Sequence, residues 1–397
     1  MSNSILDSHY PTTSNAVLVS HGWPSVNPAN SVLNSHKADY QPGGGSFSAV
    51  LNTTTGVLTI SNGSGYGTKS PAALFFYQQF TTNNGTADGD LLVGYADQRT
   101  YGSNSYGSSI TIDTGLGRTA GRGVLKLDIA AGAADFFPHV SLNTSNTGRG
   151  TLTSQGTDEL YSSYWVKFEF QSGTAASGVQ IKSARSGTGA SNTDYYTNYP
   201  RYVSSLYPAA NGTGTNNTFQ QVHDSANTAS SGEHFDTTNT GWNGNGWNFV
   251  EIWQKYNTPG VADGFFRYRI NGVEIDNDIE AQSRSAILVR GGGDGALHFD
   301  YSMLVPGVDI SGNSPSGKYR LLFSEHYVDT TTRRLVLGNA SSWSSVTACL
   351  SCPATAWSDT GITATAANVP TGYDWAYVIG ADGNPINSTG YAYSTTS

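Results

Sequence analysis

The sequence is poor in charge and in cysteine, and both shortages narrow the chemistry of the protein. Only 12% of the 397 residues are charged, about half of the usual share. The 20 Lys and Arg against 29 Asp and Glu give a net charge of -9. This charge repels phosphate backbones, so nucleic acid is not expected as a partner. Cys349 and Cys352 lack further ligand pairs and a βαβ context, so neither zinc nor redox chemistry is expected. We place them on a surface loop, either as two thiols or as one small local disulfide.

Long apolar runs and a leader are also missing. No stretch of about 18 apolar residues is present, which argues against a membrane-spanning helix and membrane insertion. The first residues, MSNSILDSHYPTTSNAVLVSHGWP, have neither the basic start nor the apolar core of a signal peptide. We therefore expect a soluble protein that is either made without Sec export or trimmed of its leader.

Helical periodicity is scarce, because Gly, Asn, Ser and Pro interrupt nearly every window with apolar residues at spacings of three and four. Short alternating runs separated by Gly- and Asn-rich turns predominate instead, which predicts an all-β fold of antiparallel jelly-roll type. The expected strands are 46–52, 56–60, 108–112, 123–129, 161–170, 247–256, 264–270 and 319–328.

The pattern divides the chain into three parts. Residues 1–72 are rich in Pro, Asn and Ser and predict an N-terminal arm or small β module. Residues 73–335 carry the densest strand pattern and predict the jelly roll, with the polar stretches 186–200 and 208–246 as long loops. Residues 336–397 predict a small immunoglobulin-like β sandwich.

One strand pair predicts a sugar-binding surface. The alternation in WNFVEIWQKY and GFFRYRI gathers aromatic and charged side chains on one face if the two strands pair in register. Indole rings stack on sugar C–H faces and cations bind hydroxyls or carboxylates, so this face is a candidate for carbohydrate binding. Its residues are Trp247, Trp253, Lys255, Arg267, Arg269 and Glu251. The alternative is a solvated outer sheet with cross-strand ion pairs.

A tight turn and an acidic run follow this strand pair. Asn271-Gly272 predicts a type I′ turn. The acids Glu274, Asp276 and Glu280 come directly after it. A retaining glycosidase needs two carboxyls about 5.5 Å apart, whereas Glu274 and Glu280 would be about 20 Å apart along a regular strand. The run is therefore interpreted as a solvent-facing strand end.

Three segments resemble the concanavalin A-like lectin/glucanase superfamily, within it the polysaccharide-lyase-like and laminin-G-like jelly rolls. They are ELYSSYWVKFEF, GVQIKSAR and WNFVEIWQKYNTPGVADGFFRYRINGVEI. In this group a strand pair of the form W-x-x-V-E-x-x-x-K-x-N-T-P-G-x-x-D-G ends in N-G. The tail is similar to immunoglobulin-like modules attached to such domains. The resemblance implies the fold more than the activity.

The same resemblance implies a set of catalytic residues. Alginate-lyase-type members carry a Q-[IV]-H strand, which Gln221-Val222-His223 matches, but their R-x-E-x-x-R and Y-x-K-x-G-x-Y strands are absent here. β-Elimination needs a group that neutralises the uronate carboxylate, a base and an acid. If the protein is a lyase, the candidates for these roles are His223, Gln221, Tyr164, Lys182 and Arg185. The missing motifs argue against this activity.

Three functional hypotheses remain. The low charge, the Gly/Asn/Ser/Thr coat and the missing leader favour a surface-displayed structural protein, a bacteriophage decoration, fibre or tail component that assembles with itself or other virion subunits and binds glycans. The first alternative is an extracellular polysaccharide lyase acting on uronate-containing glycans. The second is a free carbohydrate-binding module. No organic cofactor is expected. A structural calcium ion would find candidate ligands in Asp294, Asp300 and Asp329, although Asp is also a common turn residue.

Overall fold

The protein is described from a computed structural model. It covers residues 48–69, 75–80, 97–99, 102–103, 109–119, 121–131, 139–143, 157–172, 179–187, 201–207, 218–225, 228–238, 243, 246–274, 298–299, 301–310 and 317–397. None of the described residues belongs to a helix long and apolar enough to cross a membrane.

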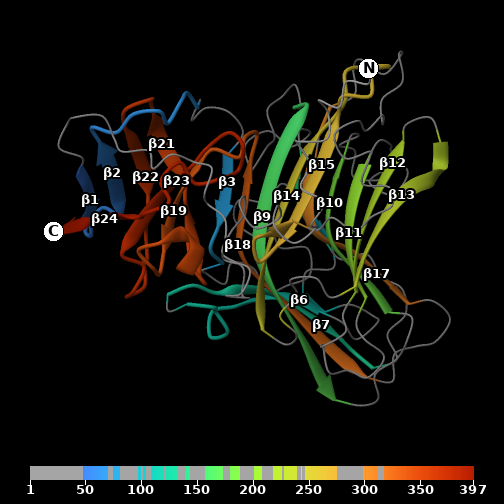
Figure 1. Ribbon diagram of the computed structural model, residues 1–397. Helices are drawn as coiled ribbons and strands as arrows, with labels where there is room; N and C mark the ends of the chain where they lie inside the picture. Colours follow the sequence, from blue (N-terminus) through green and yellow to red (C-terminus); the bar gives the residue numbers. More distant parts are fainter. Residues whose placement is uncertain are drawn as a thin grey trace, which may run out of the picture.

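The described strands form four sheets, which follow one another across the molecule (Figure 1). The seven-stranded sheet has the order β13 (Thr228–Thr238), β12 (Thr218–Ser225), β11 (Arg201–Tyr207), β10 (Val179–Gly187), β17 (Tyr301–Ile310), β8 (His139–Asn143) and β4 (Asp97–Arg99). The nine-stranded sheet has the order β16 (Val273–Glu274), β15 (Phe265–Ile270), β14 (Trp247–Lys255), β9 (Glu159–Ser172), β18 (Lys318–Asp329), β7 (Val124–Ile129), β6 (Ser109–Asp113) and β5 (Gly102–Ser103), with β3 (Phe75–Gln78) also paired to β18.

The other two sheets are smaller. The four-stranded sheet has the order β20 (Cys349–Cys352), β19 (Arg334–Gly338), β23 (Trp375–Ile379) and β24 (Tyr391–Ala392). The five-stranded sheet has the order β21 (Ala354–Trp357), β22 (Ile362–Thr365), β2 (Val57–Ser61), β1 (Ser48–Asn52) and β25 (Ser394–Thr396). Pairing among the described strands is antiparallel except between β1 and β25. The all-β prediction is confirmed.

Three hydrophobic cores hold the four layers together. The first joins the seven-stranded sheet, through Ala184 and Leu304, to the nine-stranded sheet, through residues such as Val250. The second joins the opposite face of the nine-stranded sheet, through Trp165 and Phe249, to the four-stranded sheet. The third lies between the four-stranded and five-stranded sheets. Each core is a face-to-face packing of sheets, so the inner two layers are covered on both faces.

Strand alternation explains how one sheet serves two cores. Along β19, Leu335 and Leu337 enter the core shared with the five-stranded sheet, whereas Val336 enters the core shared with the nine-stranded sheet. Successive side chains of a strand point to opposite faces. A strand covered on both faces therefore appears in the sequence as a continuous apolar run, as RLVLG does.

All eight strands expected from the sequence are present, with ends shifted by one or two residues. The prediction of a loop over 208–246 was wrong in part, because β12 and β13 lie within it. These strands are polar along much of their length, so an alternation of apolar and polar residues is hard to see in them. The predicted type I′ turn is confirmed, since Asn271 and Gly272 have φ of 51° and 78°.

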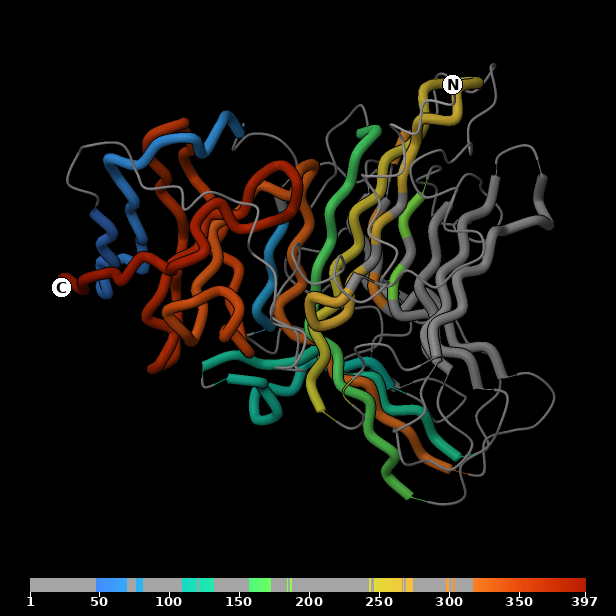
Figure 2. Tube along the Cα trace, in the orientation of Figure 1, coloured from blue at the N-terminus to red at the C-terminus, as the bar shows by residue number. Residues whose placement is uncertain are grey.

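The N-terminal hairpin packs with the C-terminal tail (Figure 2). Strand β2 pairs with β22, and β1 pairs with β25, so the segment from Ser48 to Ser61 completes the five-stranded sheet. Leu51 and Leu58 share one core with Leu335 and Leu350. We call the four-stranded and five-stranded sheets together the C-terminal module. The division at residues 72 and 335 stays a prediction, and the immunoglobulin-like assignment of the tail is not confirmed.

The prediction that the two cysteines lie on a surface loop was wrong. Cys349 and Cys352 are both buried in strand β20, and their thiols are free. Three residues apart on a strand, they point to opposite faces. Cys349 belongs to the core shared with the nine-stranded sheet and Cys352 to the core shared with the five-stranded sheet. Burial raises the pKa of Cys352 to about 12. Both thiols therefore act as small apolar groups.

A bulge in β18 marks the place where its neighbour changes from β7 to β3. Glu325 lies at this bulge with a φ of 58°, a left-handed conformation that non-glycine residues rarely adopt. Its buried carboxylate is held by Arg118, at 2.6 Å, and by Arg122, at 3.4 Å. The bulge turns a carboxylate out of the strand alternation and toward two cations.

His326, next along β18, makes the stability of the fold sensitive to acid. Its ring is fully buried and meets the ring of Phe76 edge-on. Burial lowers the pKa of His326 to about 3. The unfolded chain takes up this proton at higher pH than the folded chain, so the contribution of His326 to stability is present above the unfolded pKa and is lost as the pH falls.

We expect the variant His326→Gln to lose less stability than the wild type on acidification. Between about pH 6.5 and pH 4, the wild type should lose about 3 kcal/mol more than the variant, at about 1.4 kcal/mol per pH unit. Urea unfolding at several pH values measures the difference. A gap between the two proteins that stays constant with pH would contradict the assignment.

Candidate functional site

The predicted register of the β14–β15 pair is confirmed. Glu251 lies opposite Arg269, and Trp253 lies opposite Arg267. Directly opposite residues in a sheet share a face, so these four residues lie on one side of the nine-stranded sheet. The other side carries Val250, Ile252 and Tyr256 in the jelly-roll core, as the alternation predicts.

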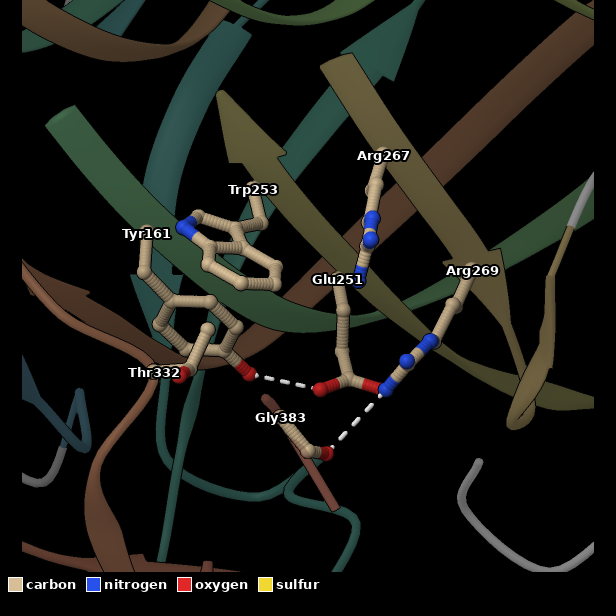
Figure 3. A pocket seen from close by; sticks show the side chains of 7 residues that line it. All are labelled: Tyr161, Glu251, Trp253, Arg267, Arg269, Thr332 and Gly383. Carbon is tan, nitrogen blue, oxygen red and sulfur yellow. Dashed lines mark hydrogen bonds between the residues drawn. The ribbon is translucent and has the colours of Figure 1, made fainter. Parts of the chain in front are cut away.

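A pocket opens on this face at the junction with the C-terminal module (Figure 3). Its volume is about 240 Å³, including the solvent at its mouth. It is lined by Tyr161, Glu251, Trp253, Arg267, Arg269, Thr332 and Gly383. Glu251, Trp253, Arg267 and Arg269 are four of the six residues expected to bind carbohydrate. Tyr161, Thr332 and Gly383 were not identified from the sequence, because only long-range folding brings them here.

Glu251 forms the floor of the pocket. Its Oε1 accepts hydrogen bonds from the Tyr161 hydroxyl, at 2.8 Å, and from Arg334 Nη2, at 2.7 Å. The side chain of Arg334 is fully buried, and its guanidinium also lies over the Tyr161 ring. Burial raises the pKa of Tyr161 well above its usual value, so the phenol stays protonated and donates to the carboxylate. Among the described residues, hydrogen bonds reach this carboxylate at Oε1 only.

The wall of the pocket is aromatic and cationic. Trp253 donates its indole N–H to Glu159 at 2.8 Å and meets Phe265 edge-on at 4.7 Å. The guanidinium of Arg267 lies 5.0 Å from the centre of the Trp253 ring. Arg269 is buried and donates to the carbonyl of Gly383 at 3.1 Å. These contacts fix the indole beside the Arg267 guanidinium, with the Arg269 guanidinium in the same pocket lining.

The other two expected carbohydrate-binding residues lie outside the pocket lining. Trp247, at the start of β14, packs against the core that joins the nine-stranded sheet to the C-terminal module. Lys255, at the end of β14, lies opposite Phe265. The face proposed from the sequence is therefore divided: one end is covered by the C-terminal module and the other end borders the pocket. The role of all six residues in carbohydrate binding stays a prediction.

A second candidate site follows from the register of the seven-stranded sheet. Ala184 lies beside Ser204 and Gln221, and Ser186 lies beside Tyr202 and His223. Ala184 and Ser186 are buried against the nine-stranded sheet. The positions that share their face of the seven-stranded sheet therefore face the core, and we call them the inner row. The positions between them face away from the core, and we call these the outer row. Its members on β10 to β13 include Gln180, Lys182, Arg185, Arg201, Ser205, Gln220, His234 and Asp236.

The residues expected to act in a lyase do not share one face. Lys182 and Arg185 are in the outer row, beside Ser205 and Val203. Gln221 and His223 are in the inner row. Tyr164 is fully buried in the core between the two large sheets, with its ring against Phe323. Lys182 and Arg185 are thus on the opposite side of the sheet from Gln221, His223 and Tyr164. The catalytic roles of all five residues stay predictions.

Of the three Asp residues considered for calcium, only Asp329 lies within the described residues. Its carboxylate is buried, pairs with Lys69 and accepts a hydrogen bond from the Tyr327 hydroxyl at 2.7 Å. Lys69 also donates to the carbonyl of Arg333 at 2.6 Å. The residue therefore belongs to a buried ion pair, which the sequence did not reveal because the two partners are 260 positions apart. The acids Asp276 and Glu280 also lie outside the described residues.

Comparisons with known proteins give partial structural likenesses. No protein-family model matches the chain, and no curated protein matches it. A solved endo-β-1,4-glucuronan lyase from the fungus Trichoderma reesei has a TM-score of 0.41 at 11% identity, covering 64% of this chain and 95% of that one. The alginate lyase Aly36B has a TM-score of 0.43 at 14% identity, covering 65% and 97%. The alginate lyase vAL-1 from Chlorella virus has a TM-score of 0.38 at 15% identity, covering 59% and 93%.

Breaking the buried pair of Glu251 and Arg334 from one side should strongly destabilise the fold. We expect Arg334→Met to lower the free energy of unfolding by about 3 to 5 kcal/mol, because it leaves a buried carboxylate without its cation. The double variant Arg334→Met with Glu251→Gln should recover a large part of that loss. Denaturant unfolding of the single and double variants checks this.

A matched control is Arg320→Ala, which breaks the partly exposed pair of Arg320 with Asp128. This variant should cost no more than about 1 kcal/mol. Equal losses in Arg334→Met and Arg320→Ala would contradict the role given to the buried pair.

Proposed function

We propose that the protein binds a uronate-containing polysaccharide along the outer row of the seven-stranded sheet and cleaves it by β-elimination. The observation that carries the proposal is that Lys182 and Arg185 lie in the same row of β10, on the side of the sheet away from the core. In the inner row, Ile181, Leu206 and Phe219 lie side by side, an apolar set that suits the core. The next set in the outer row is Lys182, Ser205, Gln220 and Asp236, all polar. A polar face built on adjacent strands suits a hydroxyl-rich, anionic chain.

The residue types in the outer row match the needs of the reaction. β-Elimination from a uronate requires that the carboxylate be neutralised, that a base remove the proton at C5, and that an acid protonate the leaving oxygen. Arg185 is assigned to the carboxylate, because guanidinium groups bind carboxylates through two parallel hydrogen bonds. Lys182, in the same row of the same strand, is assigned to both proton transfers: it takes the C5 proton as base and returns it to the leaving oxygen as acid. Gln180 and Gln220 are assigned to binding of the chain. No cofactor enters the scheme.

We expect the purified protein to release unsaturated uronates from alginate or glucuronan, followed by their ultraviolet absorbance. Arg185→Ala should lower kcat/KM by roughly a hundredfold or more, the usual effect of removing a group that stabilises the developing charge. Arg185→Lys should recover part of the activity, because it keeps the charge and loses the fork of donors.

His223→Ala is the informative comparison, because His223 lies two strands away in the inner row. We expect it to retain more activity than Arg185→Ala. If His223→Ala or Gln221→Ala abolishes turnover while Arg185→Ala leaves it intact, the reaction occurs on the other face. If a broad panel of uronate polymers gives no unsaturated product, the proposed lyase function is lost.

The other two hypotheses have unequal support. A role in carbohydrate binding without cleavage is favoured by the pocket of Figure 3, where an indole adjoins two arginines. The hypothesis of a bacteriophage virion component, with other virion subunits as partners, finds no support among the similar structures.

A further inference from the structure

We propose that the pocket between β14, β15 and the C-terminal module is a second sugar site, which holds the acidic end of one uronate unit. The choice of a uronate rests on the proposed function. The site itself rests on the geometry of Figure 3, in which Trp253, Arg267, Glu251 and Arg269 surround a common space. It is separate from the outer row, because the nine-stranded sheet and its core lie between the two.

The pocket offers a cation at its mouth. Arg267 is exposed, and its guanidinium lies 5.0 Å from the centre of the Trp253 ring and 5.8 Å from the centre of the Phe265 ring. A guanidinium stacked beside a ring keeps its N–H edge directed outward, where it can bind a carboxylate. Trp253 is only partly buried, so it supplies an apolar surface next to that cation. A ring with one carboxylate and several C–H groups fits both.

The floor of the pocket offers an acceptor. Glu251 is 3% exposed, and its Oε2 has no hydrogen-bond partner among the described residues, although Oε1 has two. A buried carboxylate oxygen without a donor costs free energy, which a donor from a ligand would recover. A sugar hydroxyl is such a donor, and its approach to Oε2 requires the pocket wall to move, because this atom is closed to solvent in the present structure. The pocket therefore pairs a hydroxyl-accepting floor with a carboxylate-binding mouth, as a sugar acid requires.

The C-terminal module closes one side. Thr332 and Gly383 line the pocket, and the carbonyl of Gly383 accepts the hydrogen bond from Arg269. A Cβ at position 383 would lie 3.3 Å from Arg269 Nη1, and Gly383 has a φ of 75°, so glycine leaves room beside the guanidinium. A bound sugar would contact both the jelly roll and the module.

The test follows the Trp253 indole N–H by nuclear magnetic resonance, with the signal assigned by its loss in Trp253→Phe. It uses the variant Arg185→Ala, so that turnover at the outer row does not consume the ligand. Sodium glucuronate should shift this signal more strongly than glucose or sodium acetate. When Arg267→Ala is added to Arg185→Ala, the affinity for glucuronate should fall roughly tenfold or more, as expected on losing a charge-assisted hydrogen bond.

Arg320→Ala is the matched control, because Arg320 lies opposite Glu169 on the same face of the same sheet, away from the pocket. It should leave glucuronate binding unchanged. Equal responses to glucose and glucuronate, equal losses in Arg267→Ala and Arg320→Ala, or no response of Trp253 to any probe would each overturn the second site. Binding that persists in a protein without lyase activity would support the pocket and reject only the proposed reaction.

Discussion

Three carboxylates buried on one face of the nine-stranded sheet are the constraint on which the arrangement of the molecule depends. Each is neutralised by a cation from a different part of the chain. Removing a charge from water costs several kcal/mol unless a partner and further hydrogen bonds replace the water. The sheet therefore cannot bury this face against an arbitrary surface. The face must be covered by the segments that carry the cations. These segments are the chain that follows the N-terminal hairpin, the β6–β7 connection and the start of β19. The pairs are Glu251 with Arg334, Glu325 with Arg118 and Arg122, and Asp329 with Lys69.

The consequence for function is that the nine-stranded sheet has little free surface where these pairs lie. One face packs on the seven-stranded sheet, and much of the other packs on the C-terminal module. The two surfaces proposed for binding lie where the covering ends. One is the far side of the seven-stranded sheet, and the other is the pocket at the edge of the module, where the buried carboxylate of Glu251 lines the floor. The same carboxylate thus contributes to module docking and to the candidate sugar site.

The sequence predicted local features well and long-range partners poorly. Alternation located β14 and β15 and grouped Trp253 with Arg267 on one face, on the condition that the two strands pair in register, which they do. The Asn271-Gly272 turn joins β15 to β16 and so fixed only that shorter pairing. Alternation alone did not show that Phe249 and Trp247 would be covered, because an aromatic face can meet solvent, sugar or another sheet. The partner of Glu251 is 83 residues away, and nothing local identifies Arg334 as that partner. The strands β12 and β13 were missed because polar residues occupy both of their faces.

The same limit applies to the residues that the sequence suggested for a lyase, because their strand faces could not be assigned from the sequence. Lys182 and Arg185 are three positions apart, which in a regular strand would direct them to opposite faces. The register of β10 shifts between Lys182 and Ala184 against both of its neighbours, so β10 has one residue more than β11 over this interval. The shift returns Arg185 to the row of Lys182. Bulges that redirect a side chain are common next to active sites. Lys182 and Arg185 therefore share a face only because the register of β10 shifts between them. The sequence of β10 alone does not reveal such a shift.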